Sequence, residues 1–221
     1  MLVAGIDEAG RGPAIGPLVV ASAVVEKRNE EELIALGVKD SKILSKVQRQ
    51  KIFRKLKRIL HDFRVVKISP KELDELMIRK SLNEIEAIKI AEMLNSLEKK
   101  PEAVVVDSPD FYADNFSKRI LKYLTFKPVI IAEHKADSNH PVVSAASIIA
   151  KIHRDREIEI LEKKHGRIGS GYVHDPITQQ FLKKWIDNNG KLPSFARKMW
   201  YSNQKMLDEK FQKSLSGWYE E

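Results

Sequence analysis

The chain has 221 residues, a formal net charge of +8 and no cysteine. This length is enough for one large domain with its own core, and the lack of cysteine excludes disulfides and thiolate metal sites. The sequence contains no apolar stretch long enough to span a membrane, and its beginning does not resemble a signal peptide. We expect a soluble, cytoplasmic monomer whose positive charge either attracts nucleic acid or simply favours solubility.

Two apolar segments at the start of the chain predict an antiparallel hairpin. Residues 2–7 form the first predicted strand, which ends at Asp7 and Glu8. A turn rich in glycine and proline follows over residues 9–17. Residues 18–25 are apolar enough for a second strand that is buried on both faces.

The rest of the chain alternates predicted helices and strands. In chain order we predict a helix over 45–60, a strand over 63–68, helices that begin at Ser69 and Ser81, a strand over 103–106, a helix over 115–124, a strand over 128–132, a long helix from Pro141 toward His165, a helix between Asp175 and Asn189, and a partly helical tail from about residue 193. Capping residues mark several helix ends. This order predicts an α/β protein: a mixed five-stranded sheet flanked by helices over residues 1–168, with a small C-terminal helical region over 169–221 packed on it.

Four carboxylates stand at the ends of predicted strands or just beyond them. Asp7 and Glu8 close the first strand, Asp107 follows the fourth, and Asp137 lies a few residues past the fifth. If these strands are neighbours, the acids converge on one rim, where they raise each other's pKa values and a divalent cation relieves the repulsion. Oxygen ligands without cysteine indicate Mg²⁺ or Mn²⁺. Each acid alone could equally be a helix cap or turn former, but the four together favour a metal site.

The glycine-rich turn does not have the spacing of a known nucleotide-binding loop. Gly10, Gly12 and Gly16 do not form G-x-G-x-x-G, they lead into a strand, and no Lys-Ser or Lys-Thr follows them. The glycines either serve a tight turn with positive φ or leave the backbone open to a sugar or phosphate. In the second case Arg11 could pair with a phosphate.

Four short motifs, in the same order along the chain, resemble those of type 2 ribonucleases H. They are Gly5–Pro13 followed by Gly16-Pro17; Asp40-Ser41-Lys42 with Leu44-Ser45; Lys135–Ser138 with Val143–Ile148, Ala150-Lys151 and Arg154-Asp155; and Gly169-Ser170-Gly171-Tyr172. The resemblance implies a ribonuclease H-like fold. It also implies an endonuclease that hydrolyses the RNA strand of RNA/DNA hybrids and incises duplex DNA on the 5′ side of embedded ribonucleotides, using two metal ions and leaving 3′-hydroxyl and 5′-phosphate ends.

The resemblance also implies roles for individual residues. Asp7, Glu8, Asp107 and Asp137 match the catalytic, metal-binding carboxylates; Gly10, Arg11 and Gly12 match the loop whose backbone reads the ribose 2′-hydroxyl; Tyr172 matches the tyrosine that bonds this hydroxyl and stacks on the next deoxyribose; Lys42, Lys151 and Arg154 would meet phosphates. Val173 stands where the family commonly has proline, so this chain departs from the family in the stiffness of the loop after Tyr172.

Alternative interpretations fit parts of this pattern. A junction resolvase or a transposase-like nuclease would share the carboxylates but would not need Gly10-Arg11-Gly12 or Tyr172. A non-catalytic nucleic-acid-binding module would have no reason to gather four acids. His134 could assist proton transfer or be a solvated loop residue. The aromatic tail over 217–221 could bind a sliding clamp or pack on the body as a helix end.

Overall fold

The computed structural model describes residues 1–38 and 43–216, with side chains described as far as residue 212. The predicted phosphate ligand Lys42 and the tail over 217–221 lie outside the described residues. The chain forms two compact units. We call Met1–Ala9, Val19–Lys67 and Lys80–His153 the sheet unit, and Gly10–Leu18, Ile68–Arg79 and Arg154–Glu221 the helical unit. The domain boundary predicted between residues 168 and 169 stays a prediction.

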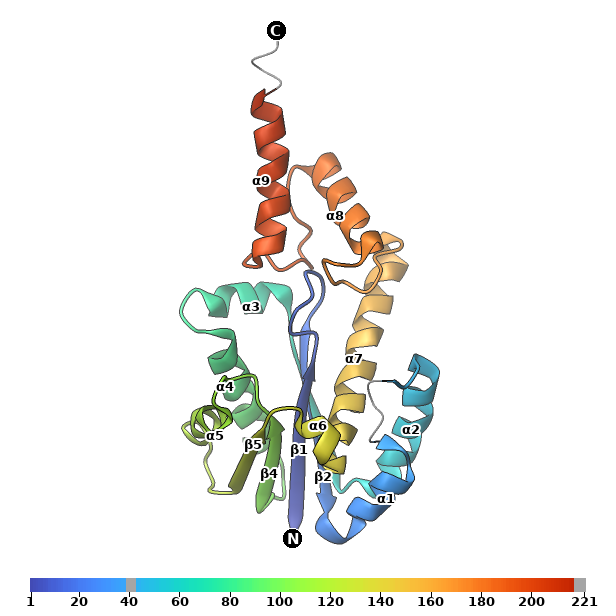
Figure 1. Ribbon diagram of the computed structural model, residues 1–221, viewed down its shortest axis with the longest axis vertical. Coiled ribbons are helices and arrows are strands. Elements are labelled where there is room, and N and C mark those ends of the chain that lie inside the picture. The colour runs from blue at the N-terminus through green and yellow to red at the C-terminus, as the bar shows by residue number, and fades with distance from the viewer. Residues whose placement is uncertain (39–42, 217–221) are drawn as a thin grey trace. The chain divides into compact units, whose positions relative to one another are not determined.

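A mixed five-stranded sheet carries the sheet unit. Its strands are β1 (Leu2–Ala9), β2 (Leu18–Glu26), β3 (Asp62–Ile68), β4 (Ala103–Asp107) and β5 (Val129–Glu133). They lie in the order β3-β2-β1-β4-β5, with β1 at the centre (Figure 1). Strand β2 runs antiparallel to β1, whereas β4 runs parallel to β1 and to β5. The predicted hairpin and the α/β fold with a mixed sheet are confirmed.

Helices follow the strands along the chain. They are α1 (Glu30–Ala35), α2 (Lys46–Ile59), α3 (Pro70–Met77), α4 (Leu82–Asn95), α5 (Ala113–Leu121), α6 (Ala136–Asn139), α7 (Pro141–His165), α8 (Pro176–Asn189) and α9 (Tyr201–Ser216), with a 3₁₀ turn at Lys27–Asn29. Serine side chains cap α2, α3 and α4, because an N-cap oxygen satisfies an otherwise orphaned backbone N–H. Helix α8 ends where Gly190 takes φ 64°. Among the described helices, none combines the length and apolarity that crossing a membrane requires.

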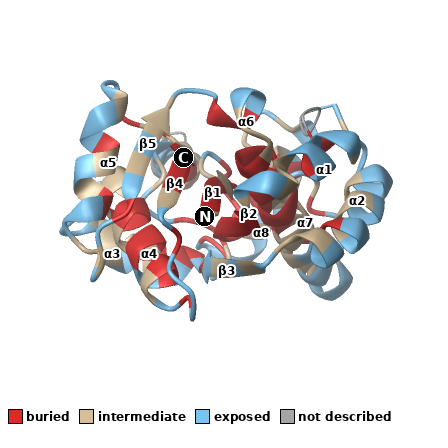
Figure 2. Ribbon diagram, turned by 90° about the horizontal axis from the view of Figure 1, so that it is seen from below, coloured by how far each residue is buried: buried red, intermediate tan, exposed pale blue. Residues whose placement is uncertain are grey.

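The core of the sheet unit lies between the central strands and the first half of α7. Buried residues of β2 and α7 belong to one apolar cluster, and Figure 2 shows buried positions concentrated in the central strands, with α2 largely exposed. Gly5 allows an unusually close approach, since a Cβ built there would lie 2.3 Å from the carbonyl carbon and oxygen of Val142. The backbone of β1 therefore touches the start of α7, and this contact brings α7 side chains next to the end of β1.

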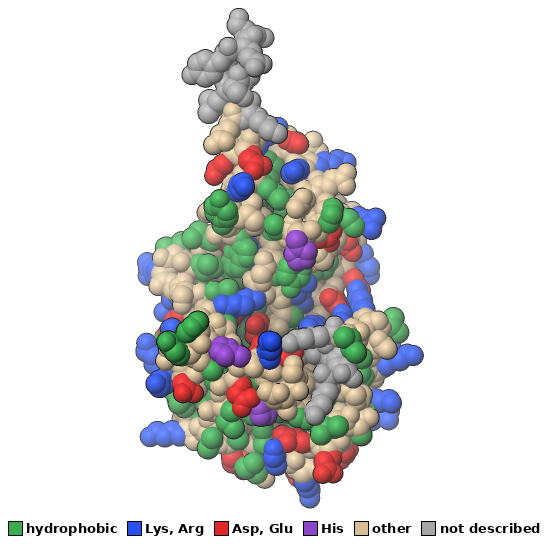
Figure 3. Space-filling model, viewed as in Figure 1, with side chains coloured by type: hydrophobic (Ala, Val, Ile, Leu, Met, Phe, Trp, Pro, Cys, Tyr) green, Lys and Arg blue, Asp and Glu red, His purple; other side chains and the backbone are tan. Residues whose placement is uncertain are grey.

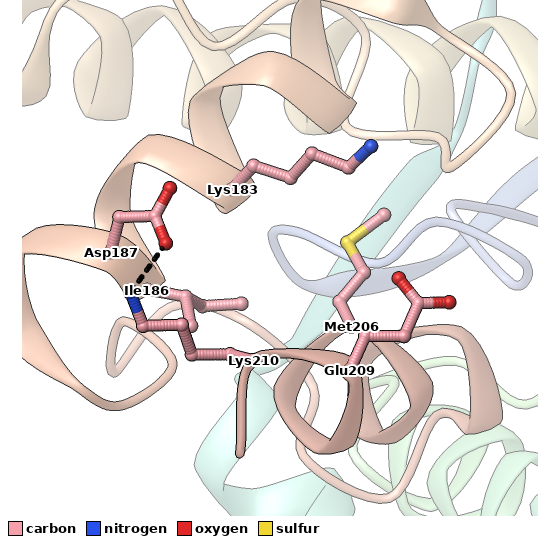
Figure 4. Close-up of a pocket in the computed structure, with 6 residues that line it drawn as sticks. All are labelled: Lys183, Ile186, Asp187, Met206, Glu209 and Lys210. Atoms are coloured by element: carbon pink, nitrogen blue, oxygen red, sulfur yellow. Dashed lines mark hydrogen bonds and ion pairs between the residues drawn. The ribbon is translucent and has the colours of Figure 1, made fainter. Parts of the chain in front are cut away.

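The helical unit has its own apolar cluster. The cluster joins the Gly/Pro-rich turn to α8 and to the segment before α9, and comprises Ala14, Ile15, Ile168, Leu182, Ile186, Leu192 and Ala196. On the surface, a pocket lies between α8 and α9, and two of its lining residues form an ion pair, with 2.9 Å between Lys210 Nζ and Asp187 Oδ1 (Figure 4). Exposed pairs of this kind contribute little to stability. The buried cluster, through Ala14 and Ile15, is therefore one of the contacts that hold the turn over residues 10–18.

Candidate active site

The ends of β1 and β4 bring two predicted carboxylates together. The parallel register pairs Ile6 with Val106, and Asp7 and Asp107 are the next residues on these two strands. Asp7 is only 7% exposed. A buried carboxylate with a second acid beside it is costly unless something compensates both charges.

The electrostatics of Asp7 show this cost. The pKa of Asp7 is raised to about 6, mainly by burial and to a smaller extent by the charge of Asp107. The opposing effects come from a hydrogen bond with the Ser147 side chain, from the backbone N–H of Glu8 at 2.8 Å, and from the charge of Lys151. Ser147 and Lys151 come from α7, and Lys151 Nζ donates to Ser147 Oγ at 2.7 Å. Lys151, which the resemblance assigns to a phosphate, therefore lies close enough to Asp7 for its positive charge to stabilise the ionised carboxylate.

Asp137 reaches this region by a different route. It lies on the four-residue helix α6, which the sequence patterns did not predict, and it is buried. Lys135, just before α6, adopts a left-handed backbone with φ 57°. This turn lets the backbone N–H of Ala136 donate to Asp107 Oδ1 at 2.8 Å, and the Ser144 hydroxyl of α7 donates to the carbonyl of Asp137. The ends of β1 and β4 and helix α6 thus hold Asp7, Asp107 and Asp137.

The strand geometry does not place Glu8 beside Asp7. It is half-buried and pairs with Val20 across the β1–β2 ladder. Since successive side chains of a strand point to opposite faces, the register places Glu8 on the face opposite Asp7. Its role as a ligand stays a prediction.

The donor chemistry of these acids fits a hard divalent cation. Among the described side chains, no group of three or more His, Asp or Glu is arranged to hold an ion. Carboxylate oxygens are the ligands that Mg²⁺ prefers, and Mg²⁺ usually binds one or two of them and keeps several waters or substrate phosphates in its shell. The raised pKa of Asp7 is the observation that supports the fit, because a bound cation would stabilise a carboxylate charge that burial, and to a smaller extent Asp107, disfavours.

In the helical unit, the glycine-rich turn and the predicted tyrosine lie together. A Cβ built on Gly12 would be 3.7 Å from Cε1 of Tyr172, which is ordinary contact. Gly10 has φ 87°, and a Cβ there would be 2.6 Å from Cδ and Nε of Arg154. The structure therefore brings together the residues that the resemblance assigns to sugar recognition.

Arg154 supports this arrangement from inside the unit. It is 7% exposed, burial lowers its pKa, and its guanidinium carbon lies 5.2 Å from the ring centroid of Tyr172. Its Nη2 donates to the carbonyl of Ser170 at 2.9 Å. Such contacts fix the tyrosine ring, which is a different task from meeting a phosphate. The phosphate contact stays a prediction.

The loop before Tyr172 is also anchored to α8. Asp175 caps α8 by accepting from the backbone N–H of Ile177 at 2.9 Å, and it accepts from that of Ser170 at 2.7 Å. The Ser170 backbone bond is the largest of several hydrogen bonds that lower the pKa of Asp175 to about 2. This anchoring fixes the loop even though Val173 follows Tyr172 instead of proline.

Arg197 is a site residue that the sequence patterns missed. It is fully buried and donates to the carbonyl oxygens of Gly10, Arg11 and Gly16. It stands in a polar tail where nothing in the spacing of apolar residues marks a buried position. A buried arginine is rare enough that the sequence alone would not have predicted it.

His134 has a role that neither sequence interpretation described. Its Nδ1 lies 3.2 Å from the carbonyl oxygen of Ser108, and its Nε2 lies 3.2 Å from that of Phe111. The ring therefore braces the loop that follows Asp107.

On the face seen in Figure 3, basic side chains are interspersed with acidic ones, so positive charge is not gathered there into one patch.

Comparison with known proteins supports the resemblance seen in the motifs. The family model described as Ribonuclease HII matches residues 4–203. A ribonuclease HII of Pyrococcus horikoshii is 48% identical over 214 residues, which cover 97% of this chain and 96% of that protein.

Solved structures extend the comparison to the fold. The crystal structure of ribonuclease H2 from Pyrococcus horikoshii superposes with a TM-score of 0.90 at 48% identity, covering 96% of this chain and all of that one. An Archaeoglobus fulgidus ribonuclease HII, solved in a complex with PCNA, has a TM-score of 0.82 at 45% identity, covering 90% of this chain and 95% of that one. The chain belongs to the ribonuclease HII family, whose members are nucleases that cleave the RNA of RNA/DNA hybrids.

Proposed function

We propose that this protein hydrolyses the RNA strand of RNA/DNA hybrids and also incises duplex DNA on the 5′ side of an embedded ribonucleotide, leaving 3′-hydroxyl and 5′-phosphate ends. The main support is the pairing of Asp7 with Asp107 at the ends of two neighbouring parallel strands of a family nuclease, with the residue before Asp137 hydrogen-bonded to Asp107. A phosphodiester also carries negative charge. A site that gathers acidic side chains therefore needs bound cations before it can accept a phosphodiester.

Asp7, Glu8, Asp107 and Asp137 would hold the Mg²⁺ or Mn²⁺ ions. When bound, two ions of this kind supply Lewis acidity and make a water more nucleophilic. The protein's own contribution is to fix the acids. Asp107 accepts from the backbone of Ala136, and Lys151 lies near enough to lower the pKa of Asp7. The positive charge of Lys151 would also favour a phosphate nearby.

Sugar recognition would fall to Gly10, Arg11, Gly12 and Tyr172. A 2′-hydroxyl is both donor and acceptor, and it is what distinguishes RNA from DNA at a site. Glycine peptides can approach a sugar closely because they carry no Cβ. Tyr172 adds a hydroxyl and a flat ring for the next sugar. The contacts of Gly12 with Tyr172, and of Gly10 with Arg154, support a single recognition surface.

The partners proposed are the RNA/DNA hybrid and the duplex that contains a ribonucleotide, with Lys42, Lys151 and Arg154 at phosphates. A sliding clamp is a further proposed partner, through the tail over 217–221, since the Archaeoglobus relative was solved with PCNA. The cytoplasmic location and the monomeric state remain predictions.

A cleavage assay with Mg²⁺ tests the proposed function. An RNA/DNA hybrid, a DNA duplex and an RNA duplex of the same sequence are compared at equal concentration. We expect cleavage of the RNA strand in the hybrid and none in the two homoduplexes. Cleavage of the DNA duplex would instead favour a resolvase-like nuclease, and binding without cleavage would favour a non-catalytic module.

A further inference from the structure

Arg197 makes an unusual set of contacts for a fully buried arginine. Its Nη1 donates to the carbonyl of Arg11 at 2.9 Å and its Nε to that of Gly16 at 3.0 Å, while Nη2 donates to the carbonyl of Gly10. Its guanidinium carbon lies 4.6 Å from the ring centroid of Trp200. All these residues belong to the helical unit, so the contacts are internal to it.

The geometry of a peptide bond gives these contacts a consequence for sugar recognition. In a trans peptide, the C=O of one residue and the N–H of the next lie in one plane and point in opposite directions. The carbonyls of Gly10 and Arg11 point toward Arg197, so the N–H groups of Arg11 and Gly12 point away from it. Arg197 thus sets the direction of two amide donors in the loop assigned to the 2′-hydroxyl.

The charge of Arg197 also affects these amides. Hydrogen bonds from a charged donor are stronger than those from a neutral one, and bonds in series polarise one another. A guanidinium that withdraws charge from a carbonyl therefore makes the N–H of the same peptide a better donor. The planar fork of arginine can reach two adjacent carbonyls at once, which the single ammonium of lysine does less well.

We propose that Arg197 is a positioning residue for 2′-hydroxyl recognition: it holds the Gly10-Arg11 and Arg11-Gly12 peptides so that their N–H groups face the ribose. This inference rests on the proposed function, because it concerns the same sugar site. Arg197 does not itself touch the substrate.

A purely structural role for Arg197 predicts a different effect of its loss on duplex binding. If Arg197 only closed the turn, its loss would weaken the fold and lower the affinity for all duplexes alike. If it positions the amide donors, its loss should reduce the affinity for a ribonucleotide in particular. Phosphate contacts supply most of the affinity for any duplex, and Arg197 makes none of them.

The test compares two duplexes that differ by one hydroxyl. The affinity of the full-length protein for a DNA duplex with one ribonucleotide, and for the same duplex made entirely of DNA, is measured in EDTA by fluorescence anisotropy. The ratio of the two affinities is the readout, because a partly unfolded sample lowers both affinities and leaves their ratio unchanged. The variants are Arg197→Met and Arg197→Lys. The lysine variant keeps the charge and nearly the length in case the methionine variant does not fold.

Asp74→Ala is the matched control. Asp74 accepts from the backbone N–H groups of Lys198 and Met199 at 2.9 and 3.0 Å, so it anchors the residues directly after Arg197 without touching Gly10 or Arg11. It should lower stability and leave the ratio unchanged. Thermal unfolding of each protein is measured alongside.

We expect the parent protein to prefer the ribonucleotide duplex by about tenfold, which is the upper range for one neutral hydrogen bond. The preference should fall to within about twofold of unity in Arg197→Met and to an intermediate value in Arg197→Lys. A preference retained in both variants would overturn the role of Arg197 alone. A parent protein without any preference would overturn the proposed sugar recognition, and the role of Arg197 with it.

Discussion

The backbone N–H of Ala136 donates to Oδ1 of Asp107 at 2.8 Å. This bond ties the carboxylate at the end of β4 to the first residue of the helix that carries Asp137. It is possible because Lys135 adopts φ 57°, a conformation that costs a non-glycine residue about 1–2 kcal/mol. The position of Asp137 is thus set by a strained turn, and the site depends on the acids being held together.

Removal of one carboxylate charge should therefore abolish most of the catalysis. Asp7→Asn, Asp107→Asn and Asp137→Asn should each lower the single-turnover rate on an RNA/DNA hybrid by about 100-fold or more, the scale of losing one preorganised electrostatic contact. Glu8→Gln should do the same if Glu8 is a ligand. Binding of the hybrid should persist, because loss of a negative charge does not weaken attraction to phosphate.

Glu133→Gln is the control for these variants. Glu133 pairs with Asp107 in the β4–β5 register, and its carboxylate accepts from His140 at 3.0 Å. It is not among the candidate ligands, so the rate should stay within about twofold of the parent. Full activity in Asp137→Asn would show that Asp137 is not one of the catalytic carboxylates.

Gly5 should be intolerant of any side chain. The Cβ of Gly5→Ala would lie 2.3 Å from the carbonyl of Val142 and 2.5 Å from the backbone nitrogen of Val143, and backbone cannot give way as a flexible side chain can. We expect destabilisation of about 3 kcal/mol, seen as a drop of about 6–12 °C in thermal unfolding.

Gly190→Ala separates steric clash from backbone preference. Gly190 has φ 64°, but nothing lies within 4 Å of a Cβ built there. Its replacement should cost only about 1 kcal/mol. Equal losses of stability in the two alanine variants would contradict the close contact between β1 and α7.

Asp175 should make stability depend on acid pH. Its pKa is lowered to about 2, below the value near 3.9 expected in an unfolded chain. The ionised form therefore stabilises the fold above about pH 4, and this contribution is lost as the pH falls toward 2. Asp175→Asn should unfold at a lower temperature than the parent at pH 7, because the neutral amide lacks the charge that strengthens the hydrogen bonds from Ser170 and Ile177.

The pH series provides the check on Asp175. Thermal unfolding of both proteins is followed by circular dichroism between pH 2 and pH 7. The difference between them should shrink steadily below pH 4. A difference that stays constant across this range would show that the charge of Asp175 does not hold the Ser170 loop.

Tyr172 should contribute both a hydroxyl and a ring to recognition of the sugar. Tyr172→Ala should lose most of the single-turnover cleavage of a duplex with one ribonucleotide, whereas Tyr172→Phe should lose less because the ring can still stack on the next sugar. Arg154 lies against that ring at 5.2 Å, so the phenyl ring should keep its position. If Tyr172→Ala cleaved this duplex as fast as the parent, Tyr172 would have no role in recognising the sugar.

Much of the fold could be predicted because strong apolar patterns mark the central strands. Strand β4 was recognised from the consecutive valines 104–106, and the predicted start of α7 at Pro141 is confirmed. The gathering of the acids followed from topology, since parallel neighbours end at the same edge of a sheet. Asp7 and Asp107 come together for that reason alone.

Other parts of the site left no signal in the sequence. Helix α6 has only four residues, too few to show a helical period, and the left-handed turn at Lys135 stands where glycine or asparagine would be expected. Arg197 is buried by contacts with carbonyls more than 180 residues away in sequence. Only the folded chain brings such backbone groups to a side chain.

The most direct test of the account uses a DNA duplex that contains one ribonucleotide and is labelled at the 5′ end of that strand. The parent protein is added with Mg²⁺, and the product length is read beside an all-DNA duplex of the same sequence. We predict a single cut at the phosphate on the 5′ side of the ribonucleotide, with a 3′-hydroxyl on the labelled product, and an intact all-DNA duplex. An uncut ribonucleotide strand, or equal cleavage of both duplexes, would contradict the account.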